Sequence, residues 1–349
     1  TRKGDGSFDN GTLVKDTAYT ASVAPGQMYS FKVTAVNKGG ESFDSEILSA
    51  MRALNEKGTV LIVNGFDRVS APESFATRDS TYAGFLDLRD GGVPYIQDIA
   101  YIGAMHEFRR RIPWMDDDSA GFGASNSDYE TTVVAGNTFD YPAVHGRSLA
   151  ELGYSFVSAS NEAVANGQVD MKKYKAVDMI MGKQRRSQLG HNENRVDFEV
   201  FPKDLRKAIA DYTAAGGNIL VSGAYVATDL WDTPKPDQDG KDFARNVLKF
   251  RWMTDCASNI GEVEPAVSPY SFLAGNYAFE SPDGLVPAGN KAFTIMRYTD
   301  NNISAGIAYK GDDYRTVVLG FPVEVIKGHD KRTEFLGKVM EFFFEGSDK

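Results

Sequence analysis

One stretch, residues 201–231, constrains the fold of this chain more than any other. Leu205 and Ile209 recur at the spacing of an amphipathic helix, and a glycine pair at 216–217 stands where such a helix would end. The apolar run 219–221 is typical of a strand that is buried on both faces. The sequence therefore predicts a helix, a tight turn and a buried strand, followed by a sharp corner into another helix.

Strand-like and helix-like segments alternate through most of the chain, which predicts an α/β fold with a doubly wound, mostly parallel sheet over residues 58–349. In such sheets, ligands bind outside the carboxyl ends of the strands. We therefore expect function at the corner that runs from Ser222 to Tyr225. The predicted order is strand 59–63, helix near 145–152, strand 154–158, helix near 161–166, strand 177–181, helix 202–215 and strand 218–222, followed by helix 243–252, strands 304–309 and 316–319, and helix 333–344.

Charge and cysteine content exclude several classes of protein. The net charge is −10 and the pI is about 5.0. Nucleic-acid binders normally carry a basic face, so we predict no nucleic-acid partner. The single cysteine, Cys256, cannot form an internal disulfide. No apolar run approaches the length of a membrane span, so no transmembrane segment is predicted. No signal peptide is visible, but Thr1 is not a natural start, so a leader that was removed stays open.

Residues 1–50 differ from the rest because their pattern is that of β-strands. Residues 28–37 alternate with period two, and residues 43–48 can pair back on them as a hairpin. This pattern resembles the last two strands of a fibronectin type III domain, in which Tyr29 would be the tyrosine-corner residue. A complete domain of that type needs about seven strands over about 100 residues. The other half would lie on another part of the chain, or these strands pack on the neighbouring domain. A generic hairpin is the alternative.

The corner after the buried strand resembles the nucleophile corner of the class I glutamine amidotransferase-like superfamily. In that family a strand runs into Gly-x-Cys-x-Gly, and the cysteine attacks an amide. Here Gly223 matches the first glycine, but Tyr225 stands at the nucleophile position and Ala227 at the last glycine. The resemblance implies the fold. It excludes a cysteine-dependent amidotransferase, since Cys256 lies in a different stretch.

A serine could replace the missing cysteine if a base lay beside it. Ser222 ends the strand, and His145 and His191 lie in polar stretches that could reach over the strand ends. The simpler alternative is a serine that bonds only to backbone. We predict catalytic roles for four residues, which are Asp128, His145, Ser222 and Tyr225.

A second candidate region is the loop 121–130, whose glycines bring the backbone close to a partner and whose polar side chains include Asp128 and Tyr129. His106 and Arg109 lie on a helix that we expect before this loop, and Gln184 follows a buried strand toward the same rim. The alternative is a long ordered loop that its own Asx-type bonds stabilise. We predict substrate-binding roles for His106, Arg109, Tyr129 and Gln184.

Metal chemistry has weak support in the sequence. No His-x-x-x-His or Cys-x-x-Cys spacing for zinc is present. The aspartate run 116–118 offers hard oxygen ligands, but an acidic run is usually a solvated surface. We predict no metal and no cofactor.

Blocks spread over residues 60–344 resemble a group of large secreted proteins of Bacteroidetes bacteria that join fibronectin type III modules to an α/β domain. Members are often labelled xanthan lyase or N-acetylmuramoyl-L-alanine amidase. The resemblance implies a secreted or cell-envelope protein, with other modules in a larger chain and with polysaccharide or peptidoglycan as its partner. The blocks are GFGASNSDYE, AGNTFDYPAVHGRSLAELGYSFVSASNEAV, DMIMGKQ and LGFPVEVI.

Two functions follow from these observations. One is a hydrolase that acts on peptidoglycan or polysaccharide, with its site at the carboxyl ends of the parallel strands. The other is a non-catalytic carbohydrate-binding or scaffold module with a degenerate amidotransferase-like fold. The ligand set of a zinc amidase and the catalytic residues of a lyase do not map onto the chain.

Overall fold

The computed structural model describes most of the chain in six stretches. These are residues 1–41, 45–66, 140–189, 195–233, 235–264 and 281–345. Backbone alone is described for five short strands, β7 (Glu73–Ala76), β8 (Ala83–Leu86), β11 (Ser187–Leu189), β12 (Arg195–Asp197) and β16 (Tyr270–Ser271).

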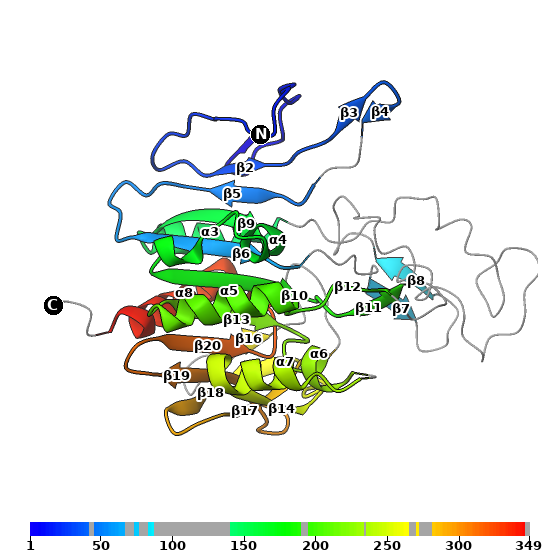
Figure 1. The fold of residues 1–349 in the computed structure, drawn as a ribbon, viewed down its shortest axis with the longest axis vertical. Coiled ribbons are helices and arrows are strands. Elements are labelled where there is room, and N and C mark those ends of the chain that lie inside the picture. The colour runs from blue at the N-terminus through cyan, green and yellow to red at the C-terminus, as the bar shows by residue number, and fades with distance from the viewer. Residues whose placement is uncertain are drawn as a thin grey trace, which may run out of the picture.

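A nine-stranded sheet forms the centre of the molecule, in the order β16-β15-β18-β19-β20-β13-β10-β6-β9 (Figure 1). The strands from β20 to β9 are parallel, and antiparallel strands extend the sheet beyond β20. All seven residues of β10 are buried, as the mostly apolar segment 177–181 predicts, although Asp178 interrupts it. The α/β fold is confirmed. The strands are β6 (Thr59–Asn64), β9 (Ser155–Ser160), β10 (Ala176–Gly182), β13 (Asn218–Gly223), β15 (Glu262–Glu264), β18 (Ala292–Tyr298), β19 (Ser304–Lys310) and β20 (Arg315–Leu319).

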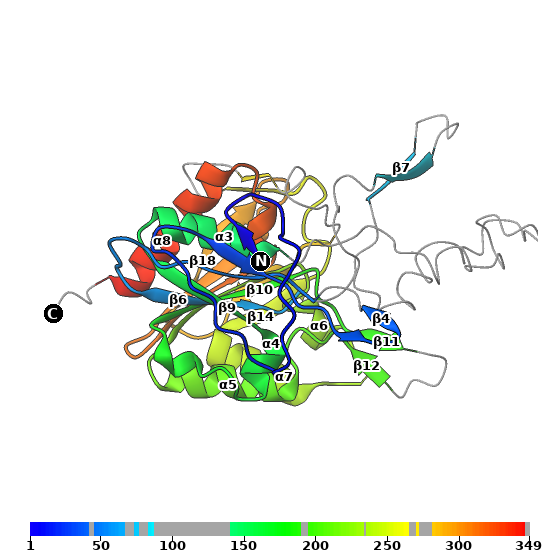
Figure 2. The ribbon, with the colours of Figure 1, turned by 90° about the horizontal axis from the view of Figure 1, so that it is seen from above.

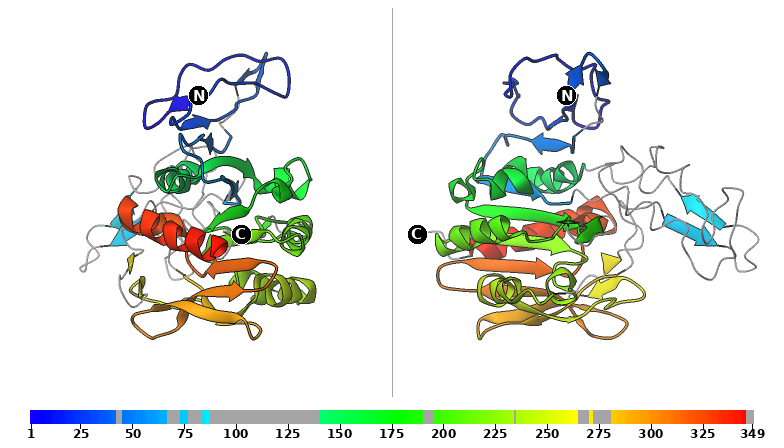
Figure 3. Two further views of the ribbon diagram at one scale, coloured as in Figure 1. Left: turned by 90° about the vertical axis from the view of Figure 1, so that its left-hand side faces the viewer. Right: turned by 45° about the vertical axis from the view of Figure 1, so that its right-hand side comes forward.

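Helices cover both faces of this sheet (Figure 2). One face carries α3 (Tyr141–Glu151) and α8 (His329–Phe344), and the other carries α4 (Asn161–Ala165), α5 (Lys203–Ala214) and α7 (Gln238–Phe243). The two layers are clearest in the left view of Figure 3. Helix α5 buries Leu205, Ile209 and Tyr212, the residues whose spacing predicts it. No helix in the described stretches is long and apolar enough to cross a membrane.

The helix predicted over 243–252 is wrong in its second half. Helix α7 ends at Phe243, a π-helical segment follows from Ala244 to Leu248, and Lys249 then adopts a left-handed conformation with φ 68°. Strand β14 (Phe250–Thr254) begins there and pairs with β17 (Gly284–Pro287). The physical reason is that burial alternates along 250–254, with the period of a strand rather than a helix.

The N-terminal residues form a small sheet of their own, from β1 (Arg2–Lys3), β2 (Tyr29–Phe31) and β5 (Leu48–Ala50). The strand predicted over 28–37 is interrupted, because β2 ends at Phe31 and a separate hairpin follows. That hairpin consists of β3 (Val36–Asn37) and β4 (Gly40–Glu41).

This N-terminal sheet packs on the edge of the main sheet, one of the two arrangements that the sequence leaves open. Met51 and Phe156 exchange two backbone hydrogen bonds, at 3.0 and 2.9 Å. Ser158 Oγ accepts from the Ser49 N–H at 2.6 Å and donates to the Ser49 carbonyl at 2.7 Å. Strand β9 therefore presents no free edge along this stretch, a common protection against pairing with other chains.

Glycines let side chains close the carboxyl ends of the central strands. Gly182 has φ 47°, and a Cβ there would lie 2.0 Å from the ring of Phe66. A Cβ on Gly65 or Gly223 would press on Met181 at 2.7 Å. Phe66 is fully buried and stacks on Tyr141, the first residue of α3, with ring centroids 5.6 Å apart.

The first prediction concerns this packing. We expect Gly182→Ala to lower the free energy of unfolding by about 2–4 kcal/mol, because it adds left-handed backbone strain and overpacks Phe66. Gly167→Ala is the matched control, since Gly167 also has positive φ (72°) but nothing lies within 4 Å of its added Cβ. The control is expected to cost about 1 kcal/mol. Urea unfolding measures both, and equal losses in the two variants would contradict the close packing.

Candidate functional site at the carboxyl edge of the sheet

A polar row crosses the central strands near their carboxyl ends. Asn64 of β6 and Ser222 of β13 both pair with Ile180 of β10, so the three side chains share one face of the sheet. Asn64 and Ser222 are fully buried. Asn64 Oδ1 and Ser222 Oγ have no hydrogen-bond partner in the part of the chain that the structure describes. Sequence reasoning found Ser222 at this edge and missed Asn64.

The segment 67–139 joins the carboxyl end of β6 to the start of α3. It carries four of the predicted site residues, His106, Arg109, Asp128 and Tyr129, and these lie outside the described residues. Their roles therefore stay predictions. The aspartate run 116–118 and His191 also lie outside the described residues.

His145 lies in a buried cluster of charged groups. It is fully buried on α3, where Nδ1 donates to Asp178 Oδ2 at 2.7 Å and Nε2 donates to Glu324 Oε2 at 3.2 Å. Asp178 comes from β10, and Glu324 from a short 3₁₀ turn, η4 (Val323–Val325). Burial alone would lower the pKa of His145, but the charges and hydrogen bonds of the two carboxylates outweigh it and raise the pKa to about 9. At neutral pH the ring is an imidazolium that ties α3, β10 and η4 together.

This cluster gives His145 two partners other than Ser222, and its predicted catalytic role stays a prediction. A general base must reach the proton that it removes, within about 3.2 Å or through one water. Both ring nitrogens of His145 instead contact carboxylates, and the ring is not exposed. Ser222 lies one strand away on the same face, but its Oγ has no recorded bond to His145 or to any other described side chain. The structure therefore places His145 in a structural ion cluster rather than in a Ser–His pair.

The corner after β13 is held by a second buried carboxylate. Asp283 is fully buried and accepts from the backbone N–H groups of Ala227 at 2.6 Å and Thr228 at 3.1 Å, and from the Thr228 hydroxyl. Burial raises the pKa of Asp283 to about 7, against the effect of these hydrogen bonds. Trp252 Nε1 donates to the same hydroxyl at 3.0 Å. The amides that follow the corner thus serve to fix α6 (Thr228–Trp231) in place.

Tyr225 stands at the corner itself and is almost fully buried, at 4% exposure. The guanidinium of Arg185 lies over its ring, 5.0 Å from the centroid. Gln184 is placed at the end of β10, as its sequence position predicts, and is 1% exposed. Neither side chain offers much surface to a ligand in this arrangement.

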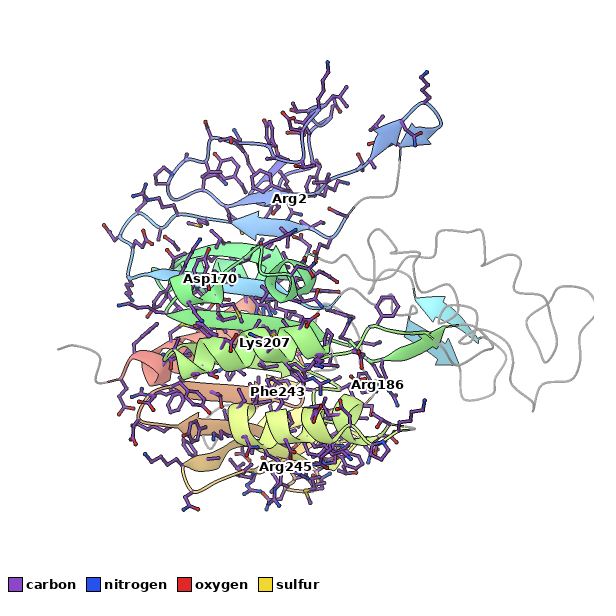
Figure 4. The ribbon with its side chains drawn as sticks, viewed as in Figure 1. Arg2, Asp170, Arg186, Lys207, Phe243 and Arg245 are labelled. Atoms are coloured by element: carbon purple, nitrogen blue, oxygen red, sulfur yellow. The ribbon has the colours of Figure 1, made fainter. Side chains whose placement is uncertain are left out.

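Basic residues after β10 are paired with acidic groups. Arg186 contacts Glu199 at 3.2 Å, and its backbone N–H donates to Asp229 Oδ1 at 2.7 Å. Asp229 also accepts from the backbone N–H of Val200 at 3.0 Å, and burial raises the pKa of this carboxyl. Figure 4 shows Arg186 at the base of the β11–β12 hairpin, beyond the carboxyl end of the sheet. The contacts with Asp229 anchor the base of the hairpin to α6.

Glu46 is a candidate that sequence reasoning missed. It precedes β5 and is partly buried at the carboxyl edge, where Asn64 Nδ2 donates to its Oε2. Burial raises the pKa of Glu46 to about 7; the Asn64 bond opposes this rise, and the negative charge of Glu162 adds to it. Because eighteen positions separate Glu46 from Asn64, no local sequence signal connects the two residues.

Metal ligation finds no support within the described stretches, where no group of three or more His, Cys, Asp or Glu side chains converges. In the His145 cluster, the two carboxylates approach opposite nitrogens of the ring, so they do not point at one shared position.

Comparison with known proteins gives no family assignment. No family model and no curated protein matches this sequence. Among solved structures, a cytoplasmic protein of Salmonella typhimurium is similar over 80% of this chain and 97% of its own, with 12% identity and a TM-score of 0.41. A polyextremophilic β-galactosidase from the Antarctic haloarchaeon Halorubrum lacusprofundi is similar over 59% of this chain, with 13% identity and a TM-score of 0.40. A β-galactosidase from Bacillus circulans sp. alkalophilus gives 15% identity and a TM-score of 0.37 over 59% of this chain.

The chain spans 27% of the length of each of these two β-galactosidases. The TM-scores are too low for any of these likenesses to carry an argument about function. The site must therefore be interpreted from its own geometry.

The second prediction follows from the His145 cluster. At pH 7 we expect His145→Gln to lower the free energy of unfolding by about 3–5 kcal/mol, because it removes the cation that lies between the buried carboxylates of Asp178 and Glu324. In the wild-type protein, the raised pKa means that this contribution is complete below pH 6.5 and is lost as the pH rises through about 9. Urea unfolding between pH 7 and 9.5 should show the gap between the two proteins closing.

A neutral version of the cluster provides the control. The triple variant with His145→Gln, Asp178→Asn and Glu324→Gln should recover part of the lost stability at pH 7, because no unpaired charge stays buried. A gap that does not change across this pH range would contradict a charged imidazolium in the cluster.

Proposed function

We propose that this chain is a glycan- or cell-wall-associated protein of the secreted or envelope compartment, and that its α/β unit is a binding module with a degenerate amidotransferase-like fold. The ligand, a polysaccharide or peptidoglycan, binds at the carboxyl edge of the parallel strands. No nucleic acid takes part, in keeping with the acidic composition.

One observation carries the preference for binding over nucleophilic catalysis. At the corner where the resembling enzymes hold their cysteine, Tyr225 is buried, and no described residue forms a hydrogen bond with Ser222 Oγ. On the same face, His145 is engaged by two carboxylates, and His329 pairs with Glu151. Among the described residues, the corner therefore holds no cysteine nucleophile, and no base or orienting group contacts Ser222.

The sequence resemblance supports the glycan partner and the larger chain. One local contact supports the resemblance to a fibronectin type III module. The Tyr29 hydroxyl accepts a hydrogen bond from the backbone N–H of Ala24, five residues upstream, at 3.2 Å. A tyrosine corner has this kind of bond. Residues 1–50 would then be the C-terminal part of such a module, and residues 58–349 the α/β domain.

A hydrolase is the second candidate, and Glu46 favours it. A carboxyl whose pKa is about 7 can donate or accept a proton at neutral pH, which general acid–base catalysis requires. In this version the remaining groups would come from the predicted residues of segment 67–139, above all Asp128.

The third prediction separates the two candidates. The protein is incubated with insoluble peptidoglycan and, separately, with xanthan, and both sedimentation of the protein and release of soluble fragments are measured. We expect binding to at least one polymer with no fragments from either. Binding to neither polymer overturns the proposal. Release of fragments would establish the hydrolase, and Asp128→Asn would then test whether the predicted loop residue carries the activity, with Ser222→Ala as the variant expected to stay active.

A further inference from the structure

Glu46 lies where two parts of the molecule meet at the carboxyl edge. It belongs to the N-terminal segment that runs into β5, and it reaches Asn64, the last residue of β6. Strand β5 runs antiparallel to β9, so the position of Glu46 falls beside the end of β9 and the start of α4. The α/β unit alone would lack this carboxyl.

Asn64 donates a hydrogen bond to the Glu46 carboxyl from the buried side of the edge. Asn64 is fully buried, and its Nδ2 is engaged by Glu46. Its Oδ1 has no partner among the residues that the structure describes. Asn64 is also the one hydrogen-bond donor recorded for the Glu46 carboxyl within those stretches. One carboxylate oxygen is therefore fixed by the protein, and the other is left to contact what approaches the edge.

The charge around Glu46 is negative. Glu162 is exposed on α4, and its negative charge raises the pKa of Glu46. Among the described residues, no other charged side chain contributes to this shift. No arginine or lysine charge in the described stretches acts on Glu46. An acidic edge of this kind accepts hydrogen bonds from hydroxyl and amide groups and repels carboxylate-bearing ligands.

We propose that Glu46, held by Asn64 and flanked by Glu162, is a ligand-contacting carboxyl that accepts hydrogen bonds from the hydroxyl or acetamido groups of an uncharged glycan and disfavours uronate-bearing polymers. This inference rests on the glycan-binding function proposed above and names its ligand class. Of the two polymers considered there, it favours one built from N-acetylated sugars over an acidic polysaccharide.

The test is a calorimetric titration of the full chain with a probe that stays uncharged, the hexamer of N-acetylglucosamine, at pH 6 and pH 8. Hydrogen bonds to an ionised carboxylate are stronger by about 1 kcal/mol than those to a neutral group, which corresponds to roughly fivefold in affinity. Wild-type binding should therefore be roughly fivefold tighter at pH 8. Glu46→Gln keeps an oxygen for Asn64 but cannot ionise. Its affinity for the hexamer should therefore be weaker than that of the wild-type protein at pH 8, and the same at both pH values.

Three further measurements complete the test. Glu46→Ala should lose roughly tenfold or more in affinity, since a charged hydrogen bond is worth about 1.5–3 kcal/mol. Glu264→Gln, on exposed β15, is the matched control and should bind as the wild-type protein does. Oligosaccharides of glucuronic acid should bind the wild-type protein more weakly than the uncharged hexamer, and the double variant Glu46→Gln with Glu162→Gln should narrow that difference.

The outcomes separate this inference from the proposed function. If the hexamer binds and Glu46→Ala, folded by its thermal melt, binds equally well, the assignment of Glu46 is wrong and the binding function stands. If uronate oligomers bind as tightly as the hexamer, the ligand class is wrong. If neither kind of glycan binds, the proposed function fails and the role of Glu46 fails with it.

Discussion

The buried ion cluster of His145, Asp178 and Glu324 is the interaction on which the arrangement of this fold depends most. Charged groups in an α/β core carry a large desolvation cost, so they persist only where partners lie in fixed positions. Here the partners come from α3, β10 and η4, far apart in the sequence. The cluster therefore fixes how α3 lies on the sheet, and with it the stack of Tyr141 on Phe66 that closes the strand ends.

The carboxyl edge combines a closely packed corner with a partly exposed acidic residue. Asp283 uses the amides after the corner to hold α6, and Tyr225 fills the space beside it. What stays partly exposed at the edge is the carboxyl of Glu46, which a neighbouring structural unit supplies. The proposed site of Glu46 lies at the contact between the N-terminal strands and the α/β sheet. A site at such a contact responds to how the two units are joined.

Sequence periodicity is sufficient to predict the central strands and α5, because burial on both faces or on one stripe leaves a local pattern. It fails at 250–254, where a strand's alternation follows directly on a helix, and at 28–37, where residues 32–35 leave the strand. The placement of His145 on a helix is predictable, but its burial is not, since its partners lie 33 and 179 positions away. One signal was present: Asp178 is an acidic residue inside an apolar strand, which requires a buried partner. No comparable signal links Glu46 to Asn64.

The central claim is that the corner after β13 is built for packing rather than for nucleophilic attack. Its most direct test is to treat the folded protein with a fluorophosphonate probe, which labels serines that a neighbouring base activates, and to map adducts by mass spectrometry. This account predicts no adduct at Ser222, because that side chain is buried and no base among the described residues contacts its Oγ. A stoichiometric adduct at Ser222 would show that a base reaches it and would contradict the account.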